Sequence, residues 1–240
     1  MAGTLKTEAV VLRSIRYGEA DRILHLYTPQ RGRIGAIAKG VRRTRSRFGG
    51  RLEPFFRLDL VLHEGRGELL TVTAAETVDG YARLRADGAG LDAAARACDA
   101  VSRLFETDEP HPEVYNLLCN ELALLDADPA RATRTNQLAF RLKLLLAAGF
   151  APQLAACTAC GAQDHLTGFS GAAGGVVCSA CEASSFPLDE AAHAFLAGAL
   201  GAPLAATPDA PERALRQAER AIAETVEHHA GVRWRAAAAG

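Results

Sequence analysis

The cysteines are the residues of this chain whose spacing most directly indicates chemistry. Two Cys-x-x-Cys pairs, Cys157/Cys160 and Cys178/Cys181, are separated by seventeen residues. This spacing is typical of a four-thiolate zinc site, in which each short turn directs two sulfur atoms at one ion. The sequence therefore predicts a structural Zn²⁺ held by all four cysteines.

Other uses of these cysteines fit the sequence less well. Two disulfides would need an oxidising compartment, and the first residues lack the apolar core of a signal peptide. A redox Cys-x-x-Cys is usually single and lies in a βαβ context. His165, between the two pairs, is interpreted as a loop histidine and not as a replacement ligand. The Gly-rich segment 167–177 has too few apolar residues for a core, so we expect the metal to hold it folded.

The remaining cysteines, Cys98 and Cys119, fall in helix-like segments, where a buried free thiol is the default interpretation. All six cysteines fit a reducing, cytoplasmic location. The longest strongly apolar run, residues 142–151, is too short to cross a bilayer, so no membrane association is expected.

Charge is distributed unevenly along the 240 residues, although the net charge is only −1. Residues 1–57 contain thirteen Lys/Arg and four Asp/Glu, whereas residues 58–240 contain fourteen and twenty-four. Such asymmetry favours a basic region that binds nucleic acid or another polyanion, attached to a neutral or acidic body.

The basic residues are densest in the segment 39–51. Arginine predominates there, and its planar guanidinium suits phosphate and stacks on bases. Tyr17 and Tyr27 lie on nearby predicted strands, and aromatic rings beside a positive groove are typical of single-strand binders. Phe55 and Phe56 are interpreted as core residues, and the competing interpretation of the segment is a solvated, mobile loop. The predicted DNA-binding residues are Lys39, Arg42, Arg43, Arg45, Arg47, Arg51, Arg33 and Tyr27.

Residues 5–77 alternate apolar and polar side chains with the period of strands, as in Leu58, Leu60 and Leu62. Turn residues at 18–21 and 29–32 separate the first strands. Five short strands without a crossover helix predict a small antiparallel barrel. The OB-fold is the five-stranded version that commonly binds nucleic acid, and an SH3-like barrel is the alternative.

From residue 78 onward the apolar residues recur with helical spacing, which predicts a helical bundle. We therefore expect an α+β multidomain protein: an OB-fold domain at 1–79, and a helical domain at 80–240 with the four-cysteine zinc element inserted at about 153–185. Arg141 and Lys143 are basic exceptions on an otherwise apolar helix. Residues 233–235 and the Ala-rich end are expected to form a frayed tail.

No catalytic motif is present, so an enzyme is not expected. The chain has no phosphate loop, no H-E-x-x-H and no G-x-S-x-G. A zinc hydrolase or deaminase would need an open metal position and a nearby glutamate base, an arrangement that this sequence lacks.

Several short motifs occur together in a specific order. The chain carries Tyr17-Gly-Glu-Ala-Asp21, Thr28-Pro-Gln-Arg-Gly32, Ala38-Lys-Gly40 and Glu53-Pro-Phe55, and later a Leu-rich stretch ending Gly149-Phe-Ala-Pro152 before Cys157. Over most of residues 5–200 this order resembles the RecO family of bacterial recombination mediators.

The resemblance implies a DNA-binding protein of DNA repair without enzymatic turnover, located in the cytoplasm with the nucleoid. RecO-like proteins bind single- and double-stranded DNA, anneal complementary strands, and join RecR to help RecA displace single-strand-binding protein. They combine an OB domain, a helical domain and a zinc element. Their contact with the acidic tail of single-strand-binding protein lies in the helical domain. Arg141 and Lys143 are candidates for that contact, the alternative being cations that snorkel from the edge of the core.

Two further hypotheses stay open at this point. One is an RNA-binding OB protein with a zinc ribbon, which would have to sense the 2′-hydroxyl to prefer RNA. The other is a non-catalytic protein scaffold, in which the helices and the zinc element serve protein contacts.

Overall fold

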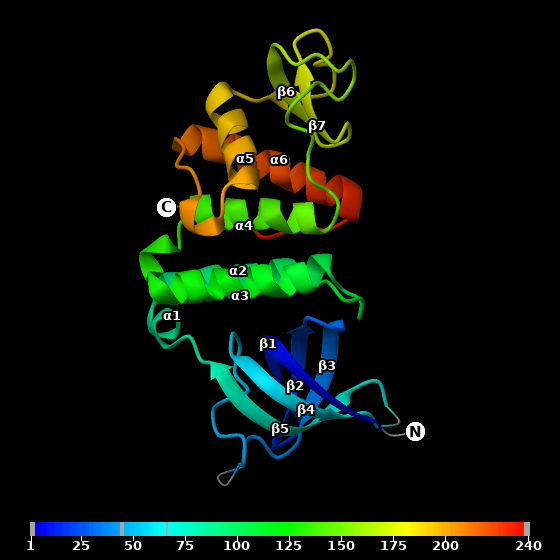
Figure 1. The fold of residues 1–240 in the computed structure, drawn as a ribbon, viewed down its shortest axis with the longest axis vertical. Coiled ribbons are helices and arrows are strands. Elements are labelled where there is room, and N and C mark those ends of the chain that lie inside the picture. The colour runs from blue at the N-terminus through cyan, green and yellow to red at the C-terminus, as the bar shows by residue number, and fades with distance from the viewer. Residues whose placement is uncertain (1–2, 44–45, 66, 238–240) are drawn as a thin grey trace. The chain divides into compact units, whose positions relative to one another are not determined.

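The computed structural model describes residues 3–43, 46–65 and 67–237. The chain forms two compact units, Met1–Pro129 and Ala130–Gly240, and each is described by itself (Figure 1). Within the described residues, no helix combines the length and the apolar character that a membrane crossing requires.

Five strands form a closed barrel in the first unit. They are β1 (Thr4–Tyr17), β2 (Asp21–Thr28), β3 (Gly32–Ala38), β4 (Arg57–His63) and β5 (Leu70–Asp79). Their order is β1-β2-β3-β5-β4, antiparallel except for the β3–β5 pair. This is the topology of a five-stranded OB barrel, so the predicted fold of the first region is confirmed. The strands end at Asp79, and a domain boundary at 79/80 stays a prediction.

The long strand β1 forms backbone hydrogen bonds with two neighbouring strands. It pairs with β4 from Thr4 to Val10 and with β2 from Val10 to Tyr17, and the β1–β2 pairing contains a bulge between Val11 and Arg13. A bulge bends a strand and re-aims its side chains, which lets one strand turn the corner of a closed barrel. The inward-facing side chains, including Leu24, Leu26 and Leu60, are almost completely buried.

Three helices pack against one end of the barrel: α1 (Ala82–Ala86), α2 (Gly88–Leu104) and α3 (Pro112–Ala127) (Figure 1). Asp87 caps α2 by accepting a hydrogen bond from the amide of Gly90. The ring of Phe105, just after α2, meets the edge of Tyr27 on β2 with centroids 6.4 Å apart. Cys98 and Cys119 are buried, as expected for core thiols, and burial raises the pKa of both.

The second unit contains the remaining helices. They are α4 (Arg134–Ala147), α5 (Glu190–Gly201) and α6 (Glu212–Ala230), with short 3₁₀ turns at η1 (Pro129–Arg131) and η2 (Leu204–Ala206). The predicted helical stripes are therefore present, and Thr133 caps α4 through the amide of Asn136.

The Gly-rich segment between the cysteine pairs is more ordered than expected. It forms β6 (Leu166–Ser170) and β7 (Gly175–Cys178), which join β8 (Phe186–Pro187) in a three-stranded sheet. Phe169, Val176 and Phe186 are buried there. The loop expected between the cysteine pairs is therefore a pair of strands, and one side chain packed against them, Phe186, comes from beyond the second cysteine pair.

The described residues after α6, 231–237, also do not form a frayed tail. Trp234 is half-buried and Ala237 is buried. The guanidinium of Arg141 donates to the carbonyl of Arg235, and the carboxylate of Glu219 accepts from the amide of Ala237. Specific polar contacts with α4 and α6 thus hold the tail, which its Ala-rich composition does not reveal.

Candidate nucleic-acid interface and metal site

The segment between β3 and β4, residues 39–56, begins beside the β1–β2 turn and ends beside α1, where the Arg85 guanidinium lies 4.2 Å from the centroid of the Phe56 ring. We call its basic part, residues 39–51, the arginine loop. Val41, Phe48 and Leu52 insert into the barrel core and are at most 9% exposed. Burial of three apolar side chains stabilises the described part of the loop on the barrel, against the alternative of a mobile loop.

The cations of the arginine loop point outward. Lys39, Arg42, Arg43, Arg47 and Arg51 are exposed, and none forms an ion pair with any carboxylate of the described residues. The guanidinium of Arg47 lies 4.8 Å from the centroid of the Phe48 ring. Alternation of buried apolar and exposed basic residues therefore leaves five positive charges at one end of the barrel.

Backbone contacts connect the arginine loop to the β1–β2 turn. The amide of Gly40 donates to the carboxylate of Asp21 at 2.7 Å, and the amide of Arg42 donates to the carbonyl of Ala20 at 2.9 Å. The guanidinium of Arg42 reaches the carbonyl of Glu19 at 3.1 Å. The loop and the turn consequently form one surface.

The other predicted DNA-binding residues lie elsewhere or outside the described residues. Tyr27 is completely buried beside Phe105, so its ring cannot receive a base, and this prediction was wrong. Arg33 is half-buried, and its guanidinium donates to the carbonyls of Ser102 and Glu106 near the end of α2. The Arg33 guanidinium is thus bound at the end of α2 and does not belong to the exposed basic surface. Arg45 lies outside the described residues.

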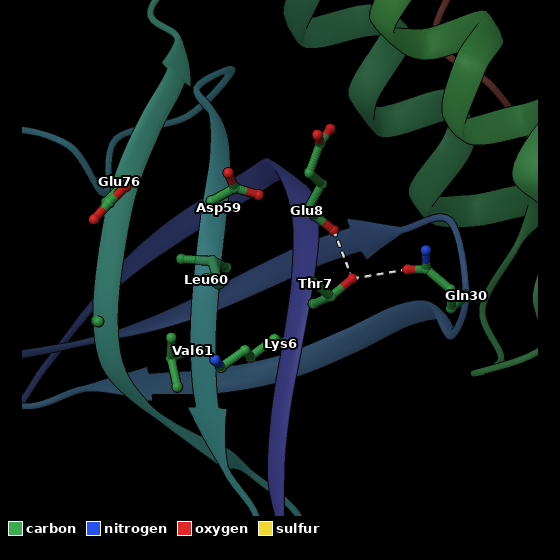
Figure 2. Close-up of a pocket in the computed structure, with 9 residues that line it drawn as sticks. Lys6, Thr7, Glu8, Gln30, Asp59, Leu60, Val61 and Glu76 are labelled. Atoms are coloured by element: carbon green, nitrogen blue, oxygen red, sulfur yellow. Dashed lines mark hydrogen bonds between the residues drawn. The ribbon is translucent and has the colours of Figure 1, made fainter.

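An acidic hollow occupies a different wall of the barrel, formed by β1, β4 and β5 (Figure 2). It has a volume of about 460 Å³. Glu8, Asp59 and Glu76 lie in register across the three strands, with Lys6 nearby. Arg57 and the hydroxyl of Tyr115 donate to the carboxylate of Glu8. Because three carboxylates line it, this hollow is a poor candidate for a phosphate-binding surface.

The hydrogen bond from Arg57 holds the pKa of Glu8 below its usual range. Burial works in the opposite direction, and the hydrogen bond from Tyr115 adds to the lowering. Through these hydrogen bonds Glu8 connects β1 to β4 and to α3, so its negative charge stabilises the fold of the first unit.

The four predicted zinc ligands converge in the second unit. All four Sγ atoms lie within 4.8 Å of one another, and those of Cys160 and Cys178 are 3.7 Å apart. A tetrahedral ion with metal–sulfur bonds of about 2.3 Å places its ligands about 3.8 Å apart. Gly161 follows the first pair with φ of +79°, which closes the turn. His165 is exposed and is not part of the cluster.

The thiol pKa values show why this cluster suits a cation. The backbone amide of Cys178 is the main reason that the pKa of Cys157 falls to about 6. Hydrogen bonding with Cys160 and Cys178 raises the pKa of Cys181 to about 12. Four thiolates at these distances repel one another unless a cation neutralises them, so the donor set fits a soft divalent metal.

The cysteine cluster lies in a long stretch that lacks cationic side chains. Residues 144–212 contain no Lys or Arg and six Asp/Glu. A surface that binds phosphates needs cations, so this stretch, with the sheet β6–β8 and α5, is a poor candidate for nucleic-acid contact.

Comparison with known proteins agrees with the motifs and the barrel. Residues 1–81 match the family model for the recombination protein O N terminal region, and residues 85–237 match the model for its C terminal region. The chain belongs to the RecO family. A DNA repair protein RecO from Anaeromyxobacter sp. (strain K) is 37% identical over 237 residues, which cover 95% of this chain and 92% of the relative.

Two further RecO relatives show comparable similarity. The DNA repair protein RecO of Rubrobacter xylanophilus is 38% identical over 232 residues, covering 93% of this chain and 90% of the relative. That of Nocardioides sp. is 38% identical over 235 residues, covering 93% of each chain. RecO similarity therefore extends over both units.

The two residues predicted to contact a RecO partner have different surroundings. Arg141 is buried and lies 3.8 Å from the carboxylate of Glu219, with the Trp234 ring 5.8 Å away. Lys143 donates to the carbonyl of Leu200, and burial lowers its pKa. Arg141 lines a hollow of about 400 Å³, which we call the α4–α6 hollow. Its lining is Arg134, Arg141, Arg216, Glu219, Arg220, Ile222, Ala223, Trp234, Arg235 and Ala236.

Sequence reasoning missed one residue, Arg16, that the β1–β2 hairpin places near the basic surface, whereas it did name Tyr17. Arg16 is exposed and lies opposite Arg22, whose own guanidinium pairs with Glu53 at 3.0 Å. Tyr17, at the end of β1, is 54% exposed. The strand register was the signal that could have placed both beside the arginine loop.

Proposed function

We propose that this protein binds single- and double-stranded DNA through the arginine loop and acts in DNA repair as a recombination mediator that anneals complementary strands. The observation that carries the proposal is the set of five exposed cations without ion pairs among the described residues, at one end of the barrel. Membership of the RecO family supports the choice of DNA as the polyanion. Arg45 lies outside the described residues, and its place in the loop sequence alone makes it a further candidate for phosphate contact.

Unpaired cations bind phosphates with little dependence on sequence, because backbone contacts position a strand without reading its bases. A strand whose phosphates are neutralised repels a second strand less. Annealing then needs no chemical step by the protein, which agrees with a role other than that of an enzyme. The acidic hollow of Figure 2 keeps the bound strand away from β4 and β5.

The test replaces Arg42, Arg43 and Arg47 by alanine together and measures affinity for a labelled oligonucleotide and the rate of strand annealing. Each lost phosphate contact removes counterion release worth about fourfold in affinity near 0.15 M salt, so a loss on the order of 50-fold is expected. The matched control replaces Arg103, Arg213 and Arg233, which are exposed and paired with carboxylates.

The control removes the same charge from other surfaces and should leave binding within about twofold. Equal losses in the two triple variants would mean that overall charge matters and not the loop. Unchanged binding and annealing in the loop variant would refute the proposed interface.

The partners follow from the same proposal. With RecR, the protein would help RecA assemble on DNA covered by single-strand-binding protein, in the cytoplasm and at the nucleoid. The acidic tail of single-strand-binding protein would occupy the α4–α6 hollow. Five arginines line that hollow, and four of them lie near Glu212, Glu219 or Glu224, so the acidic groups of the tail would compete with these carboxylates. Ile222, Ala223 and Trp234 provide apolar surface for a side chain of the tail. Lys143 donates to a backbone carbonyl, and we propose for it only a supporting charge.

Trp234 is the single tryptophan of the chain, so its fluorescence reports on this hollow directly. Titration with an acidic peptide that ends in an apolar residue should change the emission, and Arg220→Ala should weaken the response. Arg213→Ala, outside the hollow, is the control. An unchanged emission together with unchanged binding of the peptide to the Arg220 variant would exclude the hollow as the tail site.

We propose that the four cysteines hold Zn²⁺ in a structural role. The metal would fix both cysteine turns and thereby the sheet β6–β8. Two competing functions are separable by experiment. Preference for RNA over DNA of equal length would favour an RNA-binding protein. Retained DNA binding with lost partner binding after deletion of residues 150–185 would assign protein contacts to the zinc element alone.

A further inference from the structure

Tyr17 differs from every other tyrosine of the chain in its exposure. Tyr27, Tyr81 and Tyr115 are at most 4% exposed, whereas Tyr17 is 54% exposed and is the most exposed of the large apolar side chains among the described residues. Its ring has no aromatic or cation–π partner within those residues. An exposed aromatic ring without a partner is available to a ligand.

The hairpin fixes Tyr17 beside the arginine loop. Tyr17 lies opposite Asp21 across the β1–β2 pair, and the Asp21 carboxylate accepts from the amide of Gly40 at the start of the loop. The carbonyls of Glu19 and Ala20 bind Arg42. Because these contacts join the turn to the loop, Tyr17 and the loop cations lie on adjoining parts of one surface.

An apolar strip continues from Tyr17 across the outer face of the sheet. Ile15 lies two residues from Tyr17 and therefore on the same face. In the strand register it is opposite Ile23, which is opposite Ile37 on β3. All three isoleucines are only partly buried. The strip gives bases next to Tyr17 an apolar surface on which to lie.

The same face is closed at its other end. There Tyr27 packs against Phe105, and Arg33 donates to carbonyls near the end of α2. The helices of the first unit thus cover the Tyr27 end of β1–β2–β3 and leave the Tyr17 end open. This division explains why the two tyrosines on adjoining strands have opposite exposures.

We propose that Tyr17 is a base-stacking residue for single-stranded nucleic acid, with Ile15, Ile23 and Ile37 extending the base-contacting surface. The inference rests on the proposed DNA-binding function and adds a property that the loop cations do not confer. Phosphates are present on single strands and duplexes alike, but only an unpaired base offers its face to a ring. Tyr17 therefore confers preference for single strands, and the arginine loop confers affinity for both.

The experiment compares Tyr17→Ala, Tyr17→Phe and the wild type by fluorescence anisotropy with a labelled single strand and with a duplex, each at several salt concentrations. Loss of one stacked base should weaken single-strand binding about 5- to 150-fold in Tyr17→Ala. Duplex binding should stay within about twofold. The slope of log affinity against log salt should not change, because no phosphate contact is removed. Tyr17→Phe retains the ring and should bind within about threefold of the wild type.

Other outcomes separate the failure of this inference from failure of the proposed function. Equal weakening of single strand and duplex by Tyr17→Ala, or no weakening of either, overturns the stacking role while the loop interface stands. A reduced salt slope in Tyr17→Ala would show that the variant disturbs the loop, and it would also overturn the role. If the wild type binds neither substrate, the proposed function itself fails. A protein partner in place of DNA would be revealed by a variant that binds DNA normally but loses that partner.

Discussion

The arginine loop of the first unit and the arginines around the α4–α6 hollow of the second unit use the same side chain in opposite ways. In the loop, Arg42, Arg43 and Arg47 are exposed and have no carboxylate partner among the described residues. Around the hollow, Arg134 pairs with Glu212 and Glu219, and Arg141 lies near Glu219. The number of arginines in a region is therefore a poor guide to phosphate binding, and the ion pairs decide which charges are free.

The paired and the free arginines should also differ in their contribution to the free energy of unfolding. A buried cation deprived of its partner is costly, whereas an exposed cation contributes little to folding. Substitutions that break paired charges should consequently lower stability, whereas substitutions of the free loop cations should lower binding. Four changes test this difference, and they are given from the largest expected effect on stability to the smallest.

Metal removal should have the largest effect, and only on the second unit. Structural zinc sites contribute on the order of 10 kcal/mol in small domains, so Cys160→Ser should abolish metal binding and open the β6–β8 sheet to proteolysis. Metal analysis should find one ion per wild-type chain. Cys98→Ala, which removes a buried thiol outside the cluster, should retain the ion. Full metal content in the Cys160 variant would exclude the four-cysteine site.

Breaking the Glu219 pairs should cost up to about 3–5 kcal/mol, because Glu219→Gln removes one of the two carboxylates paired with Arg134 and the carboxylate near Arg141, in a poorly solvated place. The two guanidinium side chains are 12% and 6% exposed. Thermal or urea unfolding measures the change. Glu224→Gln, which removes an exposed pair with Arg220, should cost less than about 0.5 kcal/mol. Similar costs for the two variants would contradict the division between paired and free charges.

Glu8→Gln should destabilise the first unit by about 1–2 kcal/mol at neutral pH, a value reduced for the partial exposure of the pair with Arg57. The lowered pKa of Glu8 sets the pH dependence. This contribution is complete above the unfolded-state value near 4.3 and is lost as pH falls through the lower folded value. The difference between variant and wild type should therefore vanish in acid. Asp59→Asn, in register with Glu8 but without an ion pair among the described residues, is the control and should not destabilise.

The loop substitutions should have the smallest effect on stability. Replacing Arg42, Arg43 and Arg47 together should change the free energy of unfolding by less than about 0.5 kcal/mol per residue, since each is exposed. Calorimetry of the triple variant measures this directly. A large loss of stability would show that these side chains hold the barrel, and the loss of DNA binding could then no longer be assigned to phosphate contacts.

Local patterns predicted much of this molecule. The cysteine pairs converge because each turn needs only two intervening residues, and the Leu58–Leu60–Leu62 alternation forms the inner face of β4. Tertiary packing determined the rest. Tyr27 was predicted to meet bases and is buried, because Phe105, seventy-eight residues later, covers its ring. Nothing near Tyr27 in the sequence reveals that contact.

The second unit shows the same limit. Arg141 was singled out as a cation on an apolar helix, but its partner Glu219 lies on α6 and its hydrogen bond is to the tail. The Gly-rich segment was expected to lack apolar packing, and Phe186 from outside it provides the missing side chain. Pairing between distant segments is set by the fold and cannot be read from spacing.

Free cations of the arginine loop are proposed to bind nucleic-acid phosphates, and the salt dependence of single-strand affinity tests this. It should be measured for the wild type and for the variant lacking Arg42, Arg43 and Arg47. With about five phosphates neutralised, log affinity should fall with log salt at a slope near −3.5, and the variant should show a slope near −1.4. A flat response in the wild type, or the same slope in both proteins, would contradict the account.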